Sequence, residues 1–558
     1  MRARLRSGAI LAAGVVLALL ALALTQAVPP SASDTATGKP DLIPLLAGYD
    51  LIWKPVSPAD APLRGTVEDA AIAERDDRLT VWINRHATAA QRFRALQDSE
   101  YQPGVGGAYD QSVTISTALG SVLGPLYVQG YQGGRLPLTV ALLNATNGTS
   151  GAYVTTGAAK YAYSHPRPYL PSDPTTPSVA GEDANCPAAT VNAASLRAIR
   201  VGRSWADARG NLALRRVDDV VDTTHEFSPN DVLLSAGYGG FSTCRGGSFP
   251  SGHTTTAYQA ALTLATLLPE LAPELLARAS EAGNDRIVLG VHYPLDIMGG
   301  RIDGEASVAA RWADPAYRTR VLEPARAELV RYLEAQCHAT LAACIREQAP
   351  YADDPYGGAA MPGGTAQIVT DRASAVAVYR ERLGYGFPRV TAAGRAPSVP
   401  AGAAELLRTT FPTLTTAQRT AVLAQTEIGS GFPLDRTGSA SGSWERLDLA
   451  SAMSATVRVG ADGSATVART GGVARVEDAT APPALTDPGR MTDPGQMTDP
   501  GQMTDPAASN AARAPKNRGV PSGRRHDLRH LSCVTTTAAT PYGRAAGRGG
   551  RVRRGGRG

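Results

Sequence analysis

Apolar residues recur at every third or fourth position over long stretches of this chain, which is the spacing of one face of an α-helix. The pattern predicts helices over residues 67–86, 257–268, 273–291 and 323–336. Runs in which apolar and polar residues alternate, as they do in half-buried strands, are few. We therefore predict a mostly α fold.

The helical spacing is interrupted between residues 170 and 245, which are irregular and rich in Pro, Gly and Asp. A connection of this length without periodicity is usually functional, and we expect a long loop over a site. Helix-like apolar segments return at 404–426 and 443–455. We interpret them as an accessory segment that packs on the helical core.

The N-terminal end has the composition of a targeting segment. Three arginines within the first six residues precede an apolar run over 9–24 and small residues near Ala27. This is the pattern of a secretory signal peptide, and a short uncleaved anchor is the alternative. Because no other stretch is as long and apolar, we predict a secreted or periplasmic protein with no integral membrane span in the mature chain.

The C-terminal end changes character after about Ala461. TDPGRMTDPGQMTDPGQMTDP, residues 486–506, repeats Asp-Pro every six residues and cannot build a packed core, so we predict a disordered spacer. The Arg/Gly-rich tail behind it, residues 507–558, carries twelve Lys or Arg and one Asp. Weak contact with anionic surfaces is one interpretation of the tail; a functionless extension is the other, and we favour it.

The net charge of +5 is the sum of a basic tail, three N-terminal arginines and an acidic remainder of the chain. Subtracting the +11 of the tail and the three N-terminal arginines leaves about −9 for the rest of the chain. The cations are concentrated locally, which favours a small anionic substrate over a polyanion that needs a broad basic face, and no nucleic acid is required as a partner. We divide the chain into a signal peptide (1–27), an extended lead-in (28–65), a helical core (66–345), an accessory segment (346–460) and a spacer with tail (461–558).

Five cysteines suit an exported chain. We predict that Cys186 pairs with Cys244 and Cys337 with Cys344, which leaves Cys533 over. Free buried thiols are the alternative.

The residues that can carry chemistry gather in three short segments, of which the middle one is the most informative. GGSFPSGHTTTAY, residues 246–258, places glycines and prolines before His253 and an apolar helical pattern after it. A tight turn that opens a helix directs backbone N–H groups and the positive end of the helix dipole at one point, which suits an anion of phosphate size. A histidine at that place can give a proton to the group that leaves the anion.

The other two segments supply cations and a second histidine. KYAYSHPRP contains Lys160 and Arg167, and NDRIVLGVHYPLD contains Arg286, His292 and Asp296. Three cations are enough to offset a phosphate dianion and its more highly charged transition state. If the end of the third segment is helical, His292 and Asp296 share one face, and the carboxylate can accept the histidine Nδ1–H. Nε2 is then unprotonated, as a nucleophilic histidine requires.

In this order the three segments resemble the type 2 phosphatidic-acid phosphatase and vanadium haloperoxidase superfamily, whose core is a helical bundle. Residues 243–301 look most like the secreted class A nonspecific acid phosphatases of bacteria. The resemblance implies that His292 attacks phosphorus, Asp296 orients His292, and His253 protonates the leaving alcohol, without a metal or other cofactor. It also implies that phosphoryl oxygens are held by cationic side chains and by backbone amides, at Lys160, Arg167, Ser251, Gly252 and Arg286.

Two positions depart from the acid-phosphatase pattern. Asp285 stands where the family usually has Ser or another small residue. Because a carboxylate beside an anion pocket would repel the substrate, we expect Asp285 to point away from it. His165 stands where acid-phosphatase relatives often carry a further arginine, and this lowers the affinity for phosphate that we expect.

The function that the resemblance implies is a secreted, metal-independent acid phosphatase that hydrolyses small phosphomonoesters through a phosphohistidine. The alternative is a vanadium-dependent haloperoxidase, in which the same pocket holds vanadate on His292; a length of 558 residues is more typical of those enzymes. A third interpretation is a surface-binding protein whose basic tail acts and whose pocket is inactive.

Overall fold

The computed structural model describes residues 38–56, 63–102, 104–105, 108–144, 148–149, 153–182, 184–187, 190–439 and 441–478. The predicted signal peptide, the Asp-Pro repeat, the basic tail and Cys533 lie outside the described residues.

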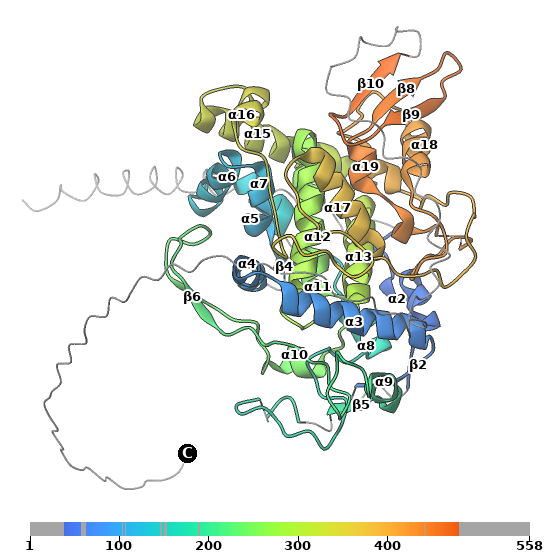
Figure 1. Ribbon diagram of the computed structural model, residues 1–558. Helices are drawn as coiled ribbons and strands as arrows, with labels where there is room; N and C mark the ends of the chain where they lie inside the picture. The colour runs from blue at the N-terminus through green and yellow to red at the C-terminus, as the bar shows by residue number, and fades with distance from the viewer. Residues whose placement is uncertain are drawn as a thin grey trace, which may run out of the picture. The chain divides into compact units, whose positions relative to one another are not determined.

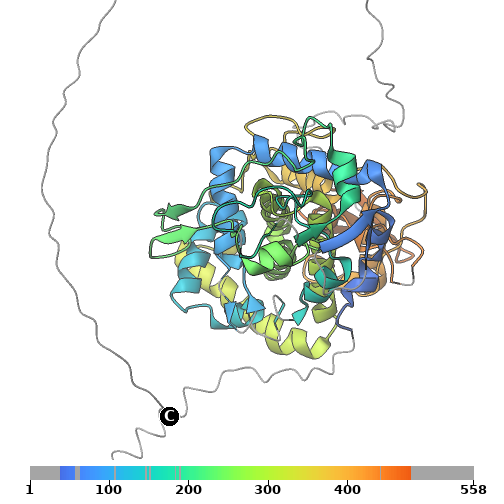
Figure 2. The ribbon, with the colours of Figure 1, turned by 90° about the horizontal axis from the view of Figure 1, so that it is seen from below.

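Three helices that are buried along almost their whole length form the centre of the described fold: α11 (Gly252–Leu267), α12 (Ala272–Val288) and α13 (Pro294–Trp312). In Figures 1 and 2 they lie side by side, with the other helices around them. The later part of α11 is rich in Ala and Leu, and its buried Thr263 and Thr266 hydroxyls donate to backbone carbonyls one turn earlier in the helix, so the helix can be buried. Charged residues on the other two helices are paired inside the core, as Arg278 of α12 is with Asp98 and Arg301 of α13 with Glu305.

The surrounding helices come from both sides of this central trio in the sequence. In chain order they are α2 (Leu42–Leu45), α3 (Ala70–His86), α4 (Ala89–Glu100), α5 (Ser112–Ile115), α6 (Leu123–Gln132), α7 (Pro137–Asn144), α8 (Gly157–Tyr163), α9 (Ala194–Arg200), α10 (Phe241–Arg245), α14 (Pro315–Tyr317), α15 (Glu323–Cys337), α16 (Leu341–Glu347), α17 (Arg372–Gly384), α18 (Thr416–Thr426) and α19 (Leu449–Met453). The predicted mostly α fold is confirmed.

Four small sheets accompany the helices. They are built from β1 (Trp53–Pro55), β2 (Leu63–Val67), β3 (Gly104–Val105), β4 (Ala108–Tyr109), β5 (Val191–Asn192), β6 (Val220–Asp222), β7 (Val232–Leu234), β8 (Thr456–Val459), β9 (Ala465–Arg469) and β10 (Arg475–Asp478). The sheet orders are β1-β2-β5, β10-β8-β9, β3-β4 and β6-β7. In the first sheet β1 pairs antiparallel with β2, with Trp53 opposite Val67, and β2 pairs parallel with β5.

Two boundaries differ from those expected from the sequence. The lead-in is not simply extended, because α2, β1 and β2 form there and bury Trp53. The sheet of β8, β9 and β10 continues to Asp478, so residues 465–478 belong to the folded part and not to a spacer. Strands of four or five residues carry too little alternation to be recognised without their partners.

The accessory segment packs on the central helices. Arg301 of α13 donates to the backbone carbonyls of Trp444 and Glu445, and the Tyr379 hydroxyl of α17 donates to Glu305. These buried contacts join the segment to the middle of α13, at Arg301 and Glu305.

Two disulfides join the predicted pairs, Cys186 with Cys244 and Cys337 with Cys344. None of the helices in the described part of the chain is both long enough and apolar enough to cross a membrane.

Candidate active site

The three motif segments converge where α11 begins and where α12 passes into α13. Lys160 lies on α8, Arg167 lies four residues beyond the end of that helix, and Arg286 lies in the last turn of α12. His292 precedes α13, and Asp296 is the third residue of α13. Segments that are more than 80 residues apart in the sequence are thereby joined by direct hydrogen bonds.

The turn before α11 is held by the cap of that helix. Ser251 is the N-cap residue, and its Oγ accepts the backbone N–H of Thr254. The backbone N–H of Ser251 donates to the Asp296 carbonyl at 2.9 Å, so this amide already has a partner. Gly252 follows at the start of the helix, and an added Cβ there would lie 3.1 Å from Thr156 Oγ1. The start of α11 therefore offers the Gly252 amide and the positive end of its dipole to an anion.

His292 and Asp296 form a buried hydrogen-bonded pair. His292 Nδ1 lies 2.9 Å from Asp296 Oδ2, which also accepts the Tyr293 backbone N–H at 3.0 Å. The sequence argument placed both residues on one helix; His292 instead lies in the turn between α12 and α13. The contact forms because Asp296, in the first turn of α13, faces back toward the residues that precede the helix.

The other ring nitrogen of His292 faces a cation. Arg167 Nη1 lies 3.0 Å from His292 Nε2 and donates to the Val291 carbonyl at 3.0 Å. Because a guanidinium can only donate, His292 Nε2 accepts and carries no proton. The proton of the neutral ring is then on Nδ1, directed at Asp296.

Arginine N–H groups beside this histidine are buried without a hydrogen-bond partner. They are Arg167 Nε, Arg286 Nε and Arg286 Nη1. Buried donors are almost always satisfied in folded proteins, so a cluster of unsatisfied ones marks a place where an acceptor binds. Lys160 Nζ donates to the carbonyls of Gly247 and Ser248, both at 3.0 Å, and keeps one proton for a further acceptor.

The positive groups of the site repel one another. Burial, and then the charge of Arg167, lowers the pKa of Arg286 to about 9 and the pKa of Lys160 well below its ordinary range. Burial and the same cations also hold the pKa of His292 well below its usual value. An anion among these groups would relieve the repulsion, which is the electrostatic character of a phosphate site.

His253 lies in the first turn of α11, is partly exposed, and interacts electrostatically with Arg286, Arg167 and Lys160. Its ring donates to the backbone carbonyl of Ser99, at the end of α4. Burial and the charges of Arg286 and Arg167 lower the pKa of His253 well below its ordinary value. A bound phosphate would offset these charges and raise the pKa, so the histidine gains its proton together with the substrate.

Both departures from the family pattern have partners in the structure. Asp285 is buried against α4, where its Oδ1 accepts from Gln91 at 2.6 Å, in agreement with the expectation that it points away from the pocket. His165 is buried too, and its Nδ1 lies 3.0 Å from Ser248 Oγ. Ser248 in turn donates to Asp296 Oδ1 at 3.2 Å. Sequence reasoning missed Ser248; its place in the glycine-containing turn, three residues before Ser251, was the available signal.

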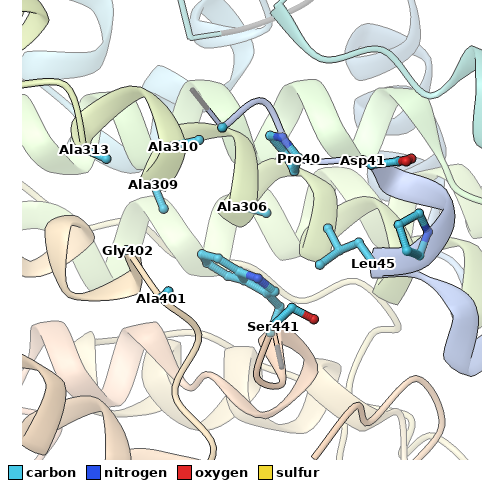
Figure 3. A pocket seen from close by; sticks show the side chains of 13 residues that line it. Pro40, Asp41, Leu45, Ala306, Ala309, Ala310, Ala313, Ala401, Gly402 and Ser441 are labelled. Atoms are coloured by element: carbon cyan, nitrogen blue, oxygen red, sulfur yellow. The ribbon is translucent and has the colours of Figure 1, made fainter. Parts of the chain in front are cut away.

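A cavity in the described part of the chain lies elsewhere. It has a volume of about 530 Å³ and is bordered by small residues of α13, such as Ala306 and Ala309, and by the ring of Trp444 (Figure 3). None of the motif side chains is among the described residues that line it. We therefore place the chemistry at the three converging segments.

Comparison with known sequences agrees with this placement. Residues 139–320, which include all three segments, match the PAP2 superfamily. The chain carries a PAP2 domain. In the structure this domain runs from α7 to the turns after α13, so it contains the central helices and the site.

Curated relatives match shorter stretches of the chain. An acid phosphatase of Zymomonas mobilis is 43% identical over 83 residues, which are 15% of this chain and 31% of that protein. A non-specific acid phosphatase of Providencia stuartii is 32% identical over 87 residues, 16% of this chain and 35% of the relative. Another, of Salmonella typhimurium, is 38% identical over 85 residues, 15% of this chain and 34% of the relative. The chain thus matches about a third of each relative's length.

The PAP2 domain contains no evident metal centre among the described residues, since no group of three or more His, Cys, Asp or Glu there is arranged to hold an ion. Its own side chains nevertheless supply a cationic anion pocket, an unprotonated imidazole nitrogen and a second imidazole.

Proposed function

We propose that the protein is an acid phosphatase that hydrolyses small phosphomonoesters through a phosphohistidine on His292. The observation that supports this most is the state of His292: its Nδ1 faces Asp296, and its Nε2 accepts a hydrogen bond beside buried arginine donors that lack acceptors. A lone pair held next to an anion pocket is what attack on a bound phosphoryl group requires. The names of the relatives point to the same reaction.

The proposed reaction has two steps. His292 Nε2 forms a bond to phosphorus while the bond from phosphorus to the ester oxygen breaks, and His253 gives its proton to that oxygen. Water then attacks the phosphohistidine, the phosphorus–nitrogen bond breaks, and His253 accepts a proton from the water. Lys160, Arg167 and Arg286 stabilise the charge that develops on the phosphoryl oxygens in both steps.

The proposal includes metal independence, because three side-chain cations and the start of α11 supply the positive charge that a metal would otherwise provide. Since His253 has to be protonated while His292 is not, an acidic optimum follows. Export is part of the proposal as well; the two disulfides and the N-terminal sequence pattern support it.

The test is the variant His292→Ala, assayed with an aryl phosphate in the presence of a chelator. We expect turnover to fall by at least about 10⁴-fold, because loss of the nucleophile in comparable catalytic units has effects of that size. Alkaline quench during turnover should trap phosphate on the wild-type protein, in a linkage that later acid treatment hydrolyses, and not on the variant.

Two outcomes would contradict the proposal. Retained turnover by His292→Ala would exclude this residue as the nucleophile. Bromide oxidation by peroxide that depends on added vanadate, with no phosphate release from the ester, would assign the pocket to the haloperoxidase alternative.

A further inference from the structure

The pair of His292 and Asp296 is one end of a longer chain of buried hydrogen bonds. Asp296 Oδ2 faces His292, and Asp296 Oδ1 accepts the Ser248 hydroxyl at 3.2 Å. Ser248 Oγ lies 3.0 Å from His165 Nδ1. Because Ser248 has a single proton and an ionised Asp296 can only accept, His165 Nδ1–H is the donor that completes the chain.

His165 is fixed from all sides. Its ring packs edge-on against Trp53 at 4.5 Å and Tyr293 at 5.1 Å between ring centres, with Tyr49 at 5.9 Å. Burial, and then the charge of Arg200, lowers the pKa of His165 to about 3. The ring is therefore neutral over the range in which the enzyme is expected to work, and it acts as a fixed hydrogen-bond donor and not as a charge.

The backbone of Ser248 ties the same place to the phosphate pocket. Its N–H donates to the His165 carbonyl at 2.7 Å, and its carbonyl accepts from Lys160 Nζ at 3.0 Å. One residue of the turn before α11 thus contacts Lys160 and His165 of the first motif and Asp296 of the third.

We propose that Ser248 and His165 are positioning residues that hold the Asp296 carboxylate in the orientation His292 needs. The inference rests on the proposed function of His292. His165 is thus a neutral donor that acts through Ser248, beside a pocket whose charge comes from Lys160, Arg167 and Arg286.

Removal of the Ser248 hydroxyl would leave Asp296 Oδ1 buried without its donor. Burial raises the pKa of Asp296 above that of an ordinary carboxyl, and the Ser248 hydrogen bond is among the contacts that oppose the rise. The other groups that face Asp296 are His292, the cations Lys160 and Arg167, the Tyr293 backbone amide and ring, Tyr49, and the buried Asp76 of α3. Without the hydroxyl, Asp296 takes up a proton at higher pH, and a protonated Asp296 no longer selects the Nδ1–H form of His292.

The experiment is a pH profile of kcat and kcat/KM for Ser248→Ala with an aryl phosphate. We expect kcat to fall about 10- to 100-fold, the usual effect of losing an outer hydrogen-bond partner of a functional histidine. KM should change much less, because the cations that hold phosphate remain. The acid limb of the profile should move to higher pH, since the Asp296 carboxylate is lost earlier as the pH falls.

Two variants of His165 and one matched control complete the design. His165→Phe keeps the aromatic packing and removes the donor, whereas His165→Asn keeps a donor; only the first should behave like Ser248→Ala. Ser307→Ala is the control, because Ser307 also donates to a buried carboxylate, Asp303, farther along α13. It should leave kcat and the acid limb unchanged.

The outcomes separate this inference from the proposed function. If Ser248→Ala matches the wild type in kcat and in the acid limb while His292→Ala is inactive, the proposed function stands and the positioning role is wrong. If His292→Ala is active, the proposed nucleophile is wrong, and an altered profile of Ser248→Ala no longer supports a role through it. Circular dichroism of His165→Phe shows whether that variant folds. If it does not fold, the result for Ser248→Ala alone decides whether the positioning role holds.

Discussion

Arg167 and Arg286 face the same pocket, but they differ in the hydrogen bonds that they already make. Arg167 Nη1 already donates to the Val291 carbonyl and to His292 Nε2, and the buried Nε of Arg167 lacks a partner. Arg286 has two unsatisfied nitrogens and is buried to 97%. A phosphate that enters has to draw the Arg167 guanidinium away from Nε2 before His292 can attack. Arg286 has no such competing bond at its two free donors.

We therefore expect Arg286→Ala to lose most of the phosphate affinity of the site. The variant should lower kcat/KM by about 10²- to 10³-fold, the effect of removing one preorganised donor to a developing oxyanion. The inhibition constant of inorganic phosphate should rise with it. Arg286→Lys should recover only part of the loss, because lysine cannot form a bidentate contact.

Arg311→Lys is a matched control for a change at a buried arginine. Arg311 lies on α13, is buried, and also has one nitrogen without a partner, Nη2. Its Nε donates to the Gly148 carbonyl, away from the three motif segments. Equal phosphate inhibition in the wild type and in Arg286→Ala would show that the unsatisfied donors of Arg286 do not bind the anion.

At the scale of elements, the contact between α4 and α12 positions both ends of the reaction. Arg278 of α12 holds Asp98 of α4 with two hydrogen bonds, at 2.8 and 2.6 Å, and both side chains are buried. The next residue of α4, Ser99, supplies the carbonyl for His253, and the end of α12 supplies Arg286. One buried ion pair thus joins the helix that holds the partner of the proposed proton donor to the helix that carries Arg286.

Removal of one member of this pair should destabilise the fold strongly. Arg278→Met leaves Asp98 as an uncompensated buried charge, and we expect a loss of about 3–5 kcal/mol in the free energy of unfolding, measured by urea denaturation. The double variant with Asp98→Asn should recover part of it. Arg346→Met, at an ion pair whose side chains are each 71% exposed, should change stability by less than about 1 kcal/mol. Similar losses at the two positions would contradict the role given to the buried pair.

At the scale of the whole molecule, the sequence predicted the helices and motifs that the spacing of nearby residues determines. The helix expected over residues 273–291 is α12, Ala272–Val288, and the motif residues do meet at one site. The turn that ends α12 was not foreseen, since Gly290, at a φ of +70°, lies within the stretch read as helical. The place of Ser248 in the turn before α11 was visible in the sequence, but its contacts were not, because they depend on His165 and Asp296, which are distant in sequence. The β8–β10 sheet was missed for the same reason.

The disulfide between Cys186 and Cys244 closes a loop with a sequence separation of 58, and the turn that carries Ser248, Ser251 and His253 begins two residues after it. On a chain-entropy estimate this closure stabilises the folded state by about 4 kcal/mol, against about 2 kcal/mol for the separation of 7 between Cys337 and Cys344. We expect the double variant Cys186→Ser with Cys244→Ser to lose activity and melt at a lower temperature. The corresponding change at Cys337 and Cys344 should leave activity intact, and equal losses in the two would remove the link to the pocket.

If this disulfide is needed for activity, the redox environment of the chain determines where the pocket can be active. A chain kept among reducing thiols would carry the turn before α11 on a long untethered loop, and its histidines and cations would not be held together. Access to an oxidant, and not a cleaved propeptide or an inhibitor, would then decide when the site becomes competent. A cell that makes the protein would be spared the hydrolysis of its own phosphate esters until the chain has left the reducing interior.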